Sequence, residues 1–386
     1  MANRNPSLFR RIFGHTLFLV NLGVALWLGL CFLAAIVPPY TVTWLALFPL
    51  SLPFALLANI FFLFLWLFLA RGKWRVVLPI FILALCYKLL LISFGWNFFG
   101  KNDMAPGPQR IKIMSWNVHG LGIFDNKGNN DKDERILDFI RNEQPDILCL
   151  PELYTQRRNT LQPYSARILE ENEFQDFRFQ YDNTLGTKIY LGIGVFSKYP
   201  IRDYQKISLA KGVNVLICDF ELPDRKMLRG YFVHLQSFLL PDKDKAAIED
   251  IKNRTAPLQA ARGMGIPRRL LTAFYRRSLQ TDKLAGELAK SPYPFFIAGD
   301  FNDVPGSYTY VRLKTGLYDA FEEKGRGLGR TYNLFSPTLR IDYLLYNPQA
   351  LKILGYRSPR MNLSDHNPVI GNFEIMDRES SMVNSQ

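Results

Sequence analysis

The sequence predicts an α/β fold in which mixed β-sheets are covered by helices, preceded by a strongly apolar segment. Three observations support this prediction. The first hundred residues are overwhelmingly apolar, whereas the rest of the chain has the composition of a soluble globular protein. In that second part strand patterns outnumber helical patterns, and helices separate only some strands, which is typical of mixed sheets. Polar clusters also follow several of the apolar runs, as expected where strand ends form a site.

Three apolar stretches approach or exceed the roughly 20 residues that a helix needs to cross a bilayer. They run over about 16–37, 42–70 and 76–99, within an expected membrane anchor of residues 1–100. A cleaved signal peptide would explain the first stretch alone but not three in succession. Because long uncharged runs of this kind are rare in soluble cores, we expect three transmembrane helices.

Basic residues predict how this anchor is oriented. They precede the first stretch and lie between the second and the third, and the link at 38–43 carries none: Arg4, Arg10, Arg11, Arg71, Lys73 and Arg75. The positive-inside rule therefore predicts a cytoplasmic N-terminus and an extracytoplasmic domain after the third stretch. We expect an integral protein of the plasma or inner membrane.

Lys88 lies near the middle of the third stretch. Its side chain is compatible with three roles: it reaches toward an interface, pairs with a polar group such as Asn59, or marks an ion or proton path. A single lysine without an acidic partner makes a poor relay, which favours a structural role.

Net charge and cysteine content restrict the function less. The formal net charge of +13 suits nucleic acid, anionic lipid or another phosphorylated ligand and does not choose among them. The four cysteines, two in the apolar stretches and two in strand-like runs, do not form a disulfide framework: Cys31, Cys86, Cys149 and Cys218. Buried free thiols are the expected state.

The elements after the anchor follow from apolar patterns and turn residues. Residues 101–109 predict a linker, and residues 110–376 a catalytic domain that begins with a strand at 111–117. A helix over 133–144, with apolar residues on one face, precedes a short buried strand at 146–152. Further strands are expected over 189–197, 213–222, 227–235, 295–299, 341–346 and 369–375. The polar tail at 377–386 is expected to be disordered.

An insertion between the third and fourth of these later strands contains two helical patterns, at about 243–261 and 267–290. Basic residues are frequent in it, with Phe274 and Tyr275 interleaved: Lys252, Arg254, Arg262, Arg268, Arg269, Arg276 and Arg277. Such a surface suits a phosphate backbone or lipid headgroups. A solvated helical face explains the same pattern equally well.

Five short polar clusters carry the chemistry, and each begins where an apolar run stops. They are Trp116-Asn117-Val118-His119-Gly120, Pro151-Glu152, His234-Leu235-Gln236-Ser237, Gly299-Asp300-Phe301-Asn302-Asp303 and Ser364-Asp365-His366-Asn367-Pro368. Each motif is weak by itself, because a Gly-Asp-x-Asn turn, for example, is often only a tight loop. A fold that gathers all five would place carboxylates, amides and imidazoles around one pocket, which suits a divalent metal beside a phosphate ester.

In the order and context of these five motifs, the chain from about Ile111 to Ile375 resembles the endonuclease/exonuclease/phosphatase (DNase I-like) superfamily. The resemblance implies a four-layer α/β sandwich, in which two packed mixed β-sheets are flanked by helices and the site lies at one edge. It also implies in-line hydrolysis of a phosphoester that depends on Mg²⁺ or Mn²⁺. A membrane-anchored bacterial-type member is the expected form.

The resemblance implies a metal site and a set of catalytic residues. Glu152 and Asn117 are similar to the metal-site pair of the family, and Asp365 to the acidic residue near the metal. Such an oxygen-rich site suits a hard cation. By this resemblance Asp300 is expected to orient and deprotonate the attacking water, and Asn302 to hydrogen-bond the scissile phosphate. His366 and His234 are expected to contact the phosphate through their imidazoles, and Asp342 to hold the His366 ring.

Two features depart from particular subfamilies. His119 stands where AP endonucleases carry an Asp in Trp-Asn-x-Asp-Gly, which argues against cleavage at abasic sites. It is expected to hydrogen-bond within its loop, with metal binding as the alternative role. The segment Arg340-Ile341-Asp342-Tyr343 lacks the Trp and Cys expected of an inositol polyphosphate 5-phosphatase. Arg330 and Tyr332 are candidates for the substrate-binding side, although their segment also fits a plain turn.

The sequence thus predicts a membrane-anchored, metal-dependent phosphoesterase acting on a phosphodiester or phosphomonoester. Its expected partners are the lipid bilayer and a phosphorylated substrate, either nucleic acid or a phospholipid or inositol-type headgroup. The alternative is a non-catalytic, membrane-tethered binding module on the same fold, against which every expected catalytic position is filled. A transporter with an appended domain would require paired broken helices, which the three stretches do not indicate.

Overall fold

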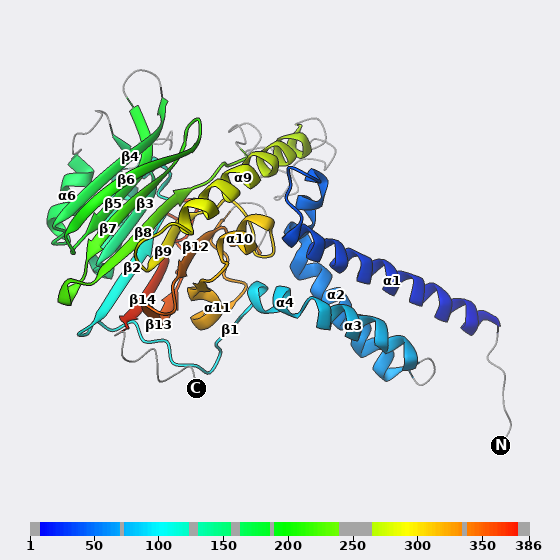
Figure 1. Cartoon of the computed structure of the whole chain (residues 1–386). Coiled ribbons are helices and arrows are strands. Elements are labelled where there is room, and N and C mark those ends of the chain that lie inside the picture. The colour runs from blue at the N-terminus through cyan, green and yellow to red at the C-terminus, as the bar shows by residue number, and fades with distance from the viewer. Residues whose placement is uncertain are drawn as a thin grey trace.

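The computed structural model describes residues 8–69, 73–122, 130–155, 163–185, 189–238, 265–333 and 338–376. A bundle of apolar helices extends from one side of an α/β sandwich (Figure 1). The expected tail and the first helical pattern of the insertion, at 243–261, lie outside these residues. The second pattern forms helix α9, Ile266–Leu288.

Two six-stranded sheets form the centre of the sandwich. The first has the strand order β10-β12-β9-β8-β7-β6, and the second β13-β14-β2-β3-β5-β4. Each is mixed, because β8 runs parallel to β9 and β2 parallel to β3, whereas the other neighbouring strands are antiparallel. The strands of the first sheet are β6 Ile201–Ala210, β7 Val213–Glu221, β8 Met227–His234, β9 Phe295–Asp300, β10 Tyr318–Asp319 and β12 Asp342–Tyr346. Those of the second are β2 Arg110–Ser115, β3 Ile147–Thr155, β4 Asp176–Leu185, β5 Ile189–Ser197, β13 Leu351–Arg357 and β14 Val369–Ile375.

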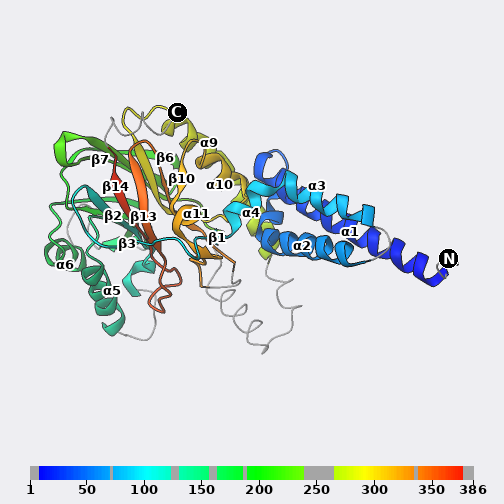
Figure 2. The same ribbon diagram turned by 90° about the horizontal axis from the view of Figure 1, so that it is seen from below.

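Apolar side chains fill three layers of core. Between the sheets they include Ile113, Cys149, Phe232 and Phe296. Helices α5 (Asn130–Glu143) and α6 (Pro163–Glu171) pack on the outer face of the second sheet, and α9 and α10 (Tyr308–Leu313) on that of the first. Figure 2 shows α5 and α6 on the side of the sheets opposite to α9 and α10. The expected four-layer α/β sandwich is therefore confirmed.

The strands that the sequence did not predict lie at the sheet edges. β6 and β10 border the first sheet, and β4 and β13 the second. An edge strand needs no continuous apolar run, because part of its surface faces solvent. In β6, for example, most side chains between Ile201 and Ala210 are exposed. Their composition is therefore close to that of loops.

The N-terminal helices form the expected apolar bundle. Helix α1 spans Leu8–Ile36, and a 3-10 segment, Thr43–Ser51, continues into α2, Leu52–Phe68. These two are long and apolar enough to cross a membrane, and a third candidate is formed by a bent pair of helices. Its parts, α3 (Val77–Leu85) and α4 (Tyr87–Ser93), meet at 63°.

This third segment differs in shape from the single helix expected over 76–99. It bends at Cys86 and ends at Ser93, and Gly95–Trp96 (β1) then pairs with Arg326–Gly327 (β11) of the sandwich.

The bundle interior contains two buried asparagine side chains, Asn21 and Asn59. Asn59 donates to the carbonyl oxygens of Val24 and Ala55 at 3.1 and 2.9 Å, so its amide is engaged by backbone and not by Lys88.

The bundle and the sandwich share one hydrophobic core. Buried side chains of α1, α2 and α4 join those of α9, α10 and the first sheet: Leu28, Leu52, Leu89, Leu284, Tyr310 and Leu313. At Gly306, with φ of 78°, an added Cβ would lie 2.6 Å from Leu52 Cδ2. Even the expected linker is attached, because Asp103 N donates to the carbonyl oxygen of Leu354 at 3.0 Å. The helices are therefore integral to the fold of the sandwich.

Candidate functional site

Three of the sequence-predicted residues form one row across the first sheet. His234, Asp300 and Asp342 are cross-strand neighbours on β8, β9 and β12. Gly299 makes this alignment possible: its φ is 138°, and a Cβ there would lie 2.0 Å from the carbonyl oxygen of Val233. Because neighbouring strands are only about 4.8 Å apart, the register alone gathers two carboxylates and an imidazole.

The second sheet supplies the facing residues. Asn117 follows β2, and Glu152 lies within β3 at a register shift between Leu150 and Leu153. The expected strand end at Glu152 is thus a β-bulge, and the φ of Glu152 is 56°. A bulge re-aims one side chain without ending the strand, and here it brings the Glu152 carboxylate to the site. Backbone conformations of this kind cluster at functional sites.

Contacts between the two sheets close the site. The Asn117 amide nitrogen donates to Glu152 Oε1 at 3.1 Å and to Asp300 Oδ2 at 3.2 Å. His234 Nε2 lies 3.5 Å from Glu152 Oε1 and 3.9 Å from Asp300 Oδ2. His366 Nε2 approaches the same Asp300 oxygen to 3.8 Å. One carboxylate oxygen of Asp300 is therefore the point at which groups from both sheets meet.

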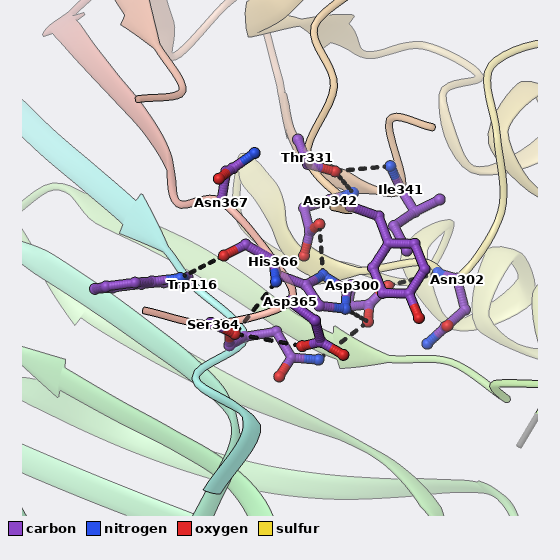
Figure 3. Close-up of polar contacts among 12 residues, drawn as sticks. Trp116, Asp300, Asn302, Thr331, Ile341, Asp342, Ser364, Asp365, His366 and Asn367 are labelled. Atoms are coloured by element: carbon purple, nitrogen blue, oxygen red, sulfur yellow. Dashed lines mark hydrogen bonds and ion pairs between the residues drawn. The ribbon is translucent and has the colours of Figure 1, made fainter. Parts of the chain in front are cut away.

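His366 has a defined orientation. Its Nδ1 lies 2.9 Å from Asp342 Oδ2, and the loop that carries it is held by Trp116, whose indole N–H donates to the His366 carbonyl oxygen at 3.0 Å (Figure 3). Asp342 itself is positioned by Thr331, whose hydroxyl oxygen accepts its backbone N–H. Burial lowers the pKa of His366, but the charges of Asp342 and Asp300 outweigh burial and raise this pKa well above its ordinary value. The two carboxylates therefore favour the protonated form of the ring.

Asp300 combines burial with a fixed geometry. Its Oδ1 accepts the backbone N–H of Asn302 at 2.7 Å, and its side chain is only 1% exposed (Figure 3). Burial raises the pKa of Asp300 to about 6, and the nearby His366 charge opposes this effect. The Asn302 amide nitrogen donates to the carbonyl oxygen of Leu235 at 3.0 Å, so Asn302 also joins the Gly299–Asp303 loop to the end of β8.

Glu152 is the more exposed carboxylate, and it is surrounded by nitrogen atoms. His119 Nδ1 lies 3.2 Å from Glu152 Oε2 and 3.9 Å from Asp365 Oδ1. Burial raises the pKa of Glu152, but the His119 hydrogen bond and the charges of His234 and His119 outweigh burial and keep this pKa well below its usual range. His119 makes the hydrogen bond predicted within its own loop, from its backbone N–H to Asn117 Oδ1 at 3.1 Å, and its ring also contacts Glu152 of the neighbouring strand.

The two residues predicted for the substrate side have internal contacts. Tyr332 is buried, and its ring centroid lies 4.9 Å from that of His366. The Arg330 guanidinium donates to the carbonyl oxygens of Tyr332 and Asn333, within its own loop. Tyr332 therefore forms one wall beside His366, whereas Arg330 shapes the loop that carries it.

Sequence reasoning missed several supporting residues. Ser364 donates its hydroxyl to the Asn117 carbonyl oxygen at 2.7 Å, and this oxygen of Ser364 accepts the His366 backbone N–H at 3.2 Å. Ser364 directly precedes Asp365 in the fifth motif, so its position was a usable signal. Thr331 lies in an unremarkable loop eleven residues before Asp342, and no sequence pattern indicates that it supports this carboxylate.

The donor set fits a hard divalent cation. Carboxylate oxygens dominate the site, and ligand atoms of Asp300, Asp342 and His366 lie within 4.8 Å of one another. Within the described parts of the chain, two buried atoms here, Asp342 Oδ1 and His234 Nε2, have no hydrogen-bond partner. Buried polar atoms normally have partners, and a shortage of them at a cluster of carboxylates indicates a site prepared for a cation or a polar ligand.

A sequence comparison identifies the family of the chain. The sequence profile described as Endonuclease/Exonuclease/phosphatase family matches residues 114–366, and that of a domain of unknown function (DUF8431) matches residues 10–100. No curated protein gives a significant match.

Several solved structures align with this chain, and one of them does so with a TM-score above 0.5. The catalytic domain of human Nocturnin with a bound sulfate anion aligns with a TM-score of 0.52 and 17% sequence identity, over 70% of this chain and 97% of that one. An endonuclease/exonuclease/phosphatase from Beutenbergia cavernae DSM 12333 aligns with a TM-score of 0.49 and 18% identity, over 69% and 72% of the two chains. For the 3′ phosphatase NExo from Neisseria bound to a product DNA hairpin, the values are 0.42, 18%, 68% and 98%.

Proposed function

The chain belongs to the endonuclease/exonuclease/phosphatase family, and from this premise we propose that it is a membrane-anchored, divalent-metal-dependent phosphoesterase. One observation carries the proposal. Glu152, Asp300 and His366 come from three separate motifs and both sheets, yet their side chains join one network of contacts shorter than 4 Å through Asn117 and His234. Hydrolysis of a phosphoester needs this combination of a cation site, a base and cationic donors.

Glu152, Asp365 and Asn117 are the residues that would hold Mg²⁺ or Mn²⁺. The depressed pKa of Glu152 keeps it ionised, and an ionised carboxylate is the preferred ligand of these cations. The more buried group of Asp300, Asp342 and His366 suits this role less, because Asp342 is engaged by the His366 ring. The Asn117 oxygen now accepts the backbone N–H of His119, so ligation would require its amide to turn. When bound, the cation supplies Lewis-acid stabilisation of the phosphoryl oxygens.

The remaining residues orient the reactants and move protons. Asp300 orients the attacking water and takes its proton, for which a pKa of about 6 is well matched near neutral pH. His366, held as a cation by Asp342, donates from Nε2 to a phosphoryl oxygen. His234 donates from the neighbouring position, since its Nε2 is 3.5 Å from Glu152, and Asn302 orients the scissile phosphate. Tyr332 excludes water from one side of the His366 ring.

The anchor supports an extracytoplasmic location of the sandwich. In Figure 1 the N-terminal end of α1, the C-terminal end of α2 and the N-terminal end of α3 all lie at the far end of the bundle from the sandwich. Arg75, at this far end, donates to the Gly14 carbonyl oxygen at 2.8 Å. Basic residues remain on the cytoplasmic side of a membrane. The sandwich would then act outside the cytoplasm, on nucleic acid or on a phospholipid or inositol-type headgroup.

Hydrolysis by purified full-length protein in detergent, with and without EDTA, tests the proposal. A diester reporter, a short DNA hairpin with a 3′ phosphate, and phospholipid vesicles would be supplied separately, and phosphate or leaving group measured. We expect EDTA-sensitive turnover of at least one substrate, restored by Mg²⁺ or Mn²⁺.

Variants then connect this turnover to the site. Asp300→Asn should lower it about 10²- to 10⁴-fold, the range for loss of a general base, and Glu152→Ala should abolish stimulation by metal. Asp203→Asn, an exposed carboxylate on β6, is the matched control and should leave turnover unchanged. Full turnover by correctly folded Asp300→Asn protein would refute the assignment.

A further inference from the structure

Lys88 does not lie inside a straight membrane span. The bend between α3 and α4 comes at Cys86, so Lys88 is in the first turn of α4, on the segment that enters the sandwich. The Lys88 side chain is exposed, and within the described ranges no carboxylate or carbonyl oxygen pairs with its ammonium group. An unpaired ammonium on an apolar segment has a strong preference for an anion.

A cavity of about 660 Å³ lies where Lys88 projects, between the helical bundle and the sandwich. The bundle lines it with apolar side chains, among them Phe32, Leu85 and Leu91. The sandwich lines it with polar groups, among them Lys314, which directly follows α10, and Glu322 of α11 (Ala320–Lys324). None of the residues of the candidate active site lines this cavity. It therefore has an amphipathic wall and is separate from the catalytic chemistry.

Exposed aromatic residues indicate the depth of this cavity relative to a membrane. Trp44 follows α1, Tyr87 begins α4, and Trp96 follows α4, and these side chains are 53%, 52% and 52% exposed. Trp and Tyr side chains gather at the level of lipid headgroups. All three flank the junction between bundle and sandwich, so the cavity lies where a headgroup meets the acyl chains.

The charges in the cavity distinguish among lipids. Lys314 Nζ lies 2.6 Å from Glu322 Oε2, and these two charges neutralise each other. Lys88 then leaves the lining with one uncompensated positive charge. The phosphate of either lipid class can pair with Lys88, but the additional cation of a zwitterionic headgroup would find Glu322 already engaged by Lys314.

We propose that this cavity binds an anionic phospholipid, with its phosphate at Lys88 and its acyl chains along Phe32, Leu85 and Leu91. The bound lipid would also stabilise the contact between the two parts of the chain. Tyr310 lines the cavity, and the guanidinium of Arg340 lies 5.5 Å from its ring centroid. Arg340 in turn donates to the Ile92 carbonyl oxygen at the end of α4. This binding does not depend on the proposed catalytic activity.

Native mass spectrometry of the full-length protein in detergent tests the proposal. Phosphatidylglycerol and phosphatidylcholine with identical acyl chains would be titrated separately, in EDTA and in the Asp300→Asn background, so that hydrolysis cannot consume the lipid. We expect phosphatidylglycerol to bind at least tenfold more tightly than phosphatidylcholine. Lys88→Gln should weaken phosphatidylglycerol about five- to tenfold, as expected for one lysine at a membrane surface, and Lys88→Arg should retain it.

The matched control is Lys352→Gln, which removes an exposed lysine on β13 whose side chain is 62% exposed. It should leave the affinity unchanged. Equal binding of the two lipids, an unchanged affinity in Lys88→Gln, or equally tight binding of oleate would each overturn the proposal. Folding of each variant is checked by its thermal midpoint without lipid, and a Lys88→Gln protein that fails to fold is replaced by Lys88→Met for the same titration.

Discussion

Arg340 and Asp342 are two residues apart, yet they belong to buried polar clusters of opposite design. In the junction cluster, Arg340 pairs with Asp319 at 2.6 Å and donates to the Ile92 carbonyl oxygen at 2.9 Å. In the site cluster, Asp342 and Asp300 share His366. The first cluster is neutralised by its own members and holds the two parts of the chain together. The second has more carboxylates than cations, which is stable only with a ligand or with raised pKa values.

The first way to test this contrast is to remove the cation of the junction cluster. Arg340→Ala leaves Asp319 buried without a countercharge, and we expect a loss of about 3–5 kcal/mol in the free energy of unfolding. Denaturant titration of the full-length protein in detergent measures it. Arg202→Ala breaks a pair in which the arginine is 61% exposed and should cost less than about 1 kcal/mol. Similar losses in both variants would contradict the structural role of Arg340.

Within the site cluster, we expect an effect on activity instead of stability. Asp342→Asn keeps the size of the side chain that contacts His366 Nδ1 but removes its charge, so the pKa of His366 falls and the ring loses its carboxylate partner. Turnover should fall about 10- to 100-fold, while the unfolding midpoint changes little. If stability collapses and the remaining folded protein is fully active, Asp342 belongs with the structural cluster.

Stability as a function of pH sharpens the comparison further. The pKa of Asp300 is raised from 3.8 to about 6 in the folded protein, so its ionisation opposes folding. This cost is absent below about pH 4, grows as the pH rises toward 6, and is complete above it. In EDTA, Asp300→Asn should therefore stabilise the protein by up to about 3 kcal/mol at pH 7 and by nothing near pH 4. A destabilised variant at pH 7 would show that the carboxylate is compensated in the fold.

The smallest expected effect concerns the contact between Gly306, which lies between β9 and α10, and Leu52 of the bundle. Gly306→Ala forces a methyl group against Leu52, whereas Gly316→Ala, at a similar φ of 77°, meets nothing within 4 Å. Both variants are destabilised by the positive φ, so the difference between their losses of stability measures the packing against α2. We expect Gly306→Ala to be less stable by about 1 kcal/mol or slightly more. Identical thermal midpoints would indicate that the Leu52 side chain moves aside at no cost in stability.

Much of the active site could be predicted from the sequence, but little of the junction between the helical bundle and the sandwich could. Asp300 and His234 could be predicted because each lies where an apolar strand ends, and Asp342 because its segment resembles the family; the strand register then makes the three neighbours. The bulge at Glu152 was not predictable, because a bulge depends on pairing with β5 and not on local composition. The edge strands were missed because solvent contact removes the apolar pattern.

The contacts at the junction could not be predicted from the sequence for a different reason. Arg340 and the Ile92 carbonyl oxygen are separated by 248 positions, and nothing near either residue indicates the other. The bend at Cys86 has no proline at its position, and it arises where α4 leaves the bundle to join the sandwich. Pairwise contacts of this range follow from the complete fold.

The continuous core across α2, α4, α9 and α10 has a practical and an evolutionary consequence. A fragment expressed from residue 101 onward would present the bare faces of α9 and α10 to water, and we expect it to aggregate when overproduced. Exchange of the N-terminal segment for an unrelated membrane tether should fail in the same way. A substitution on one face of this shared core would then require a compensating change on the other.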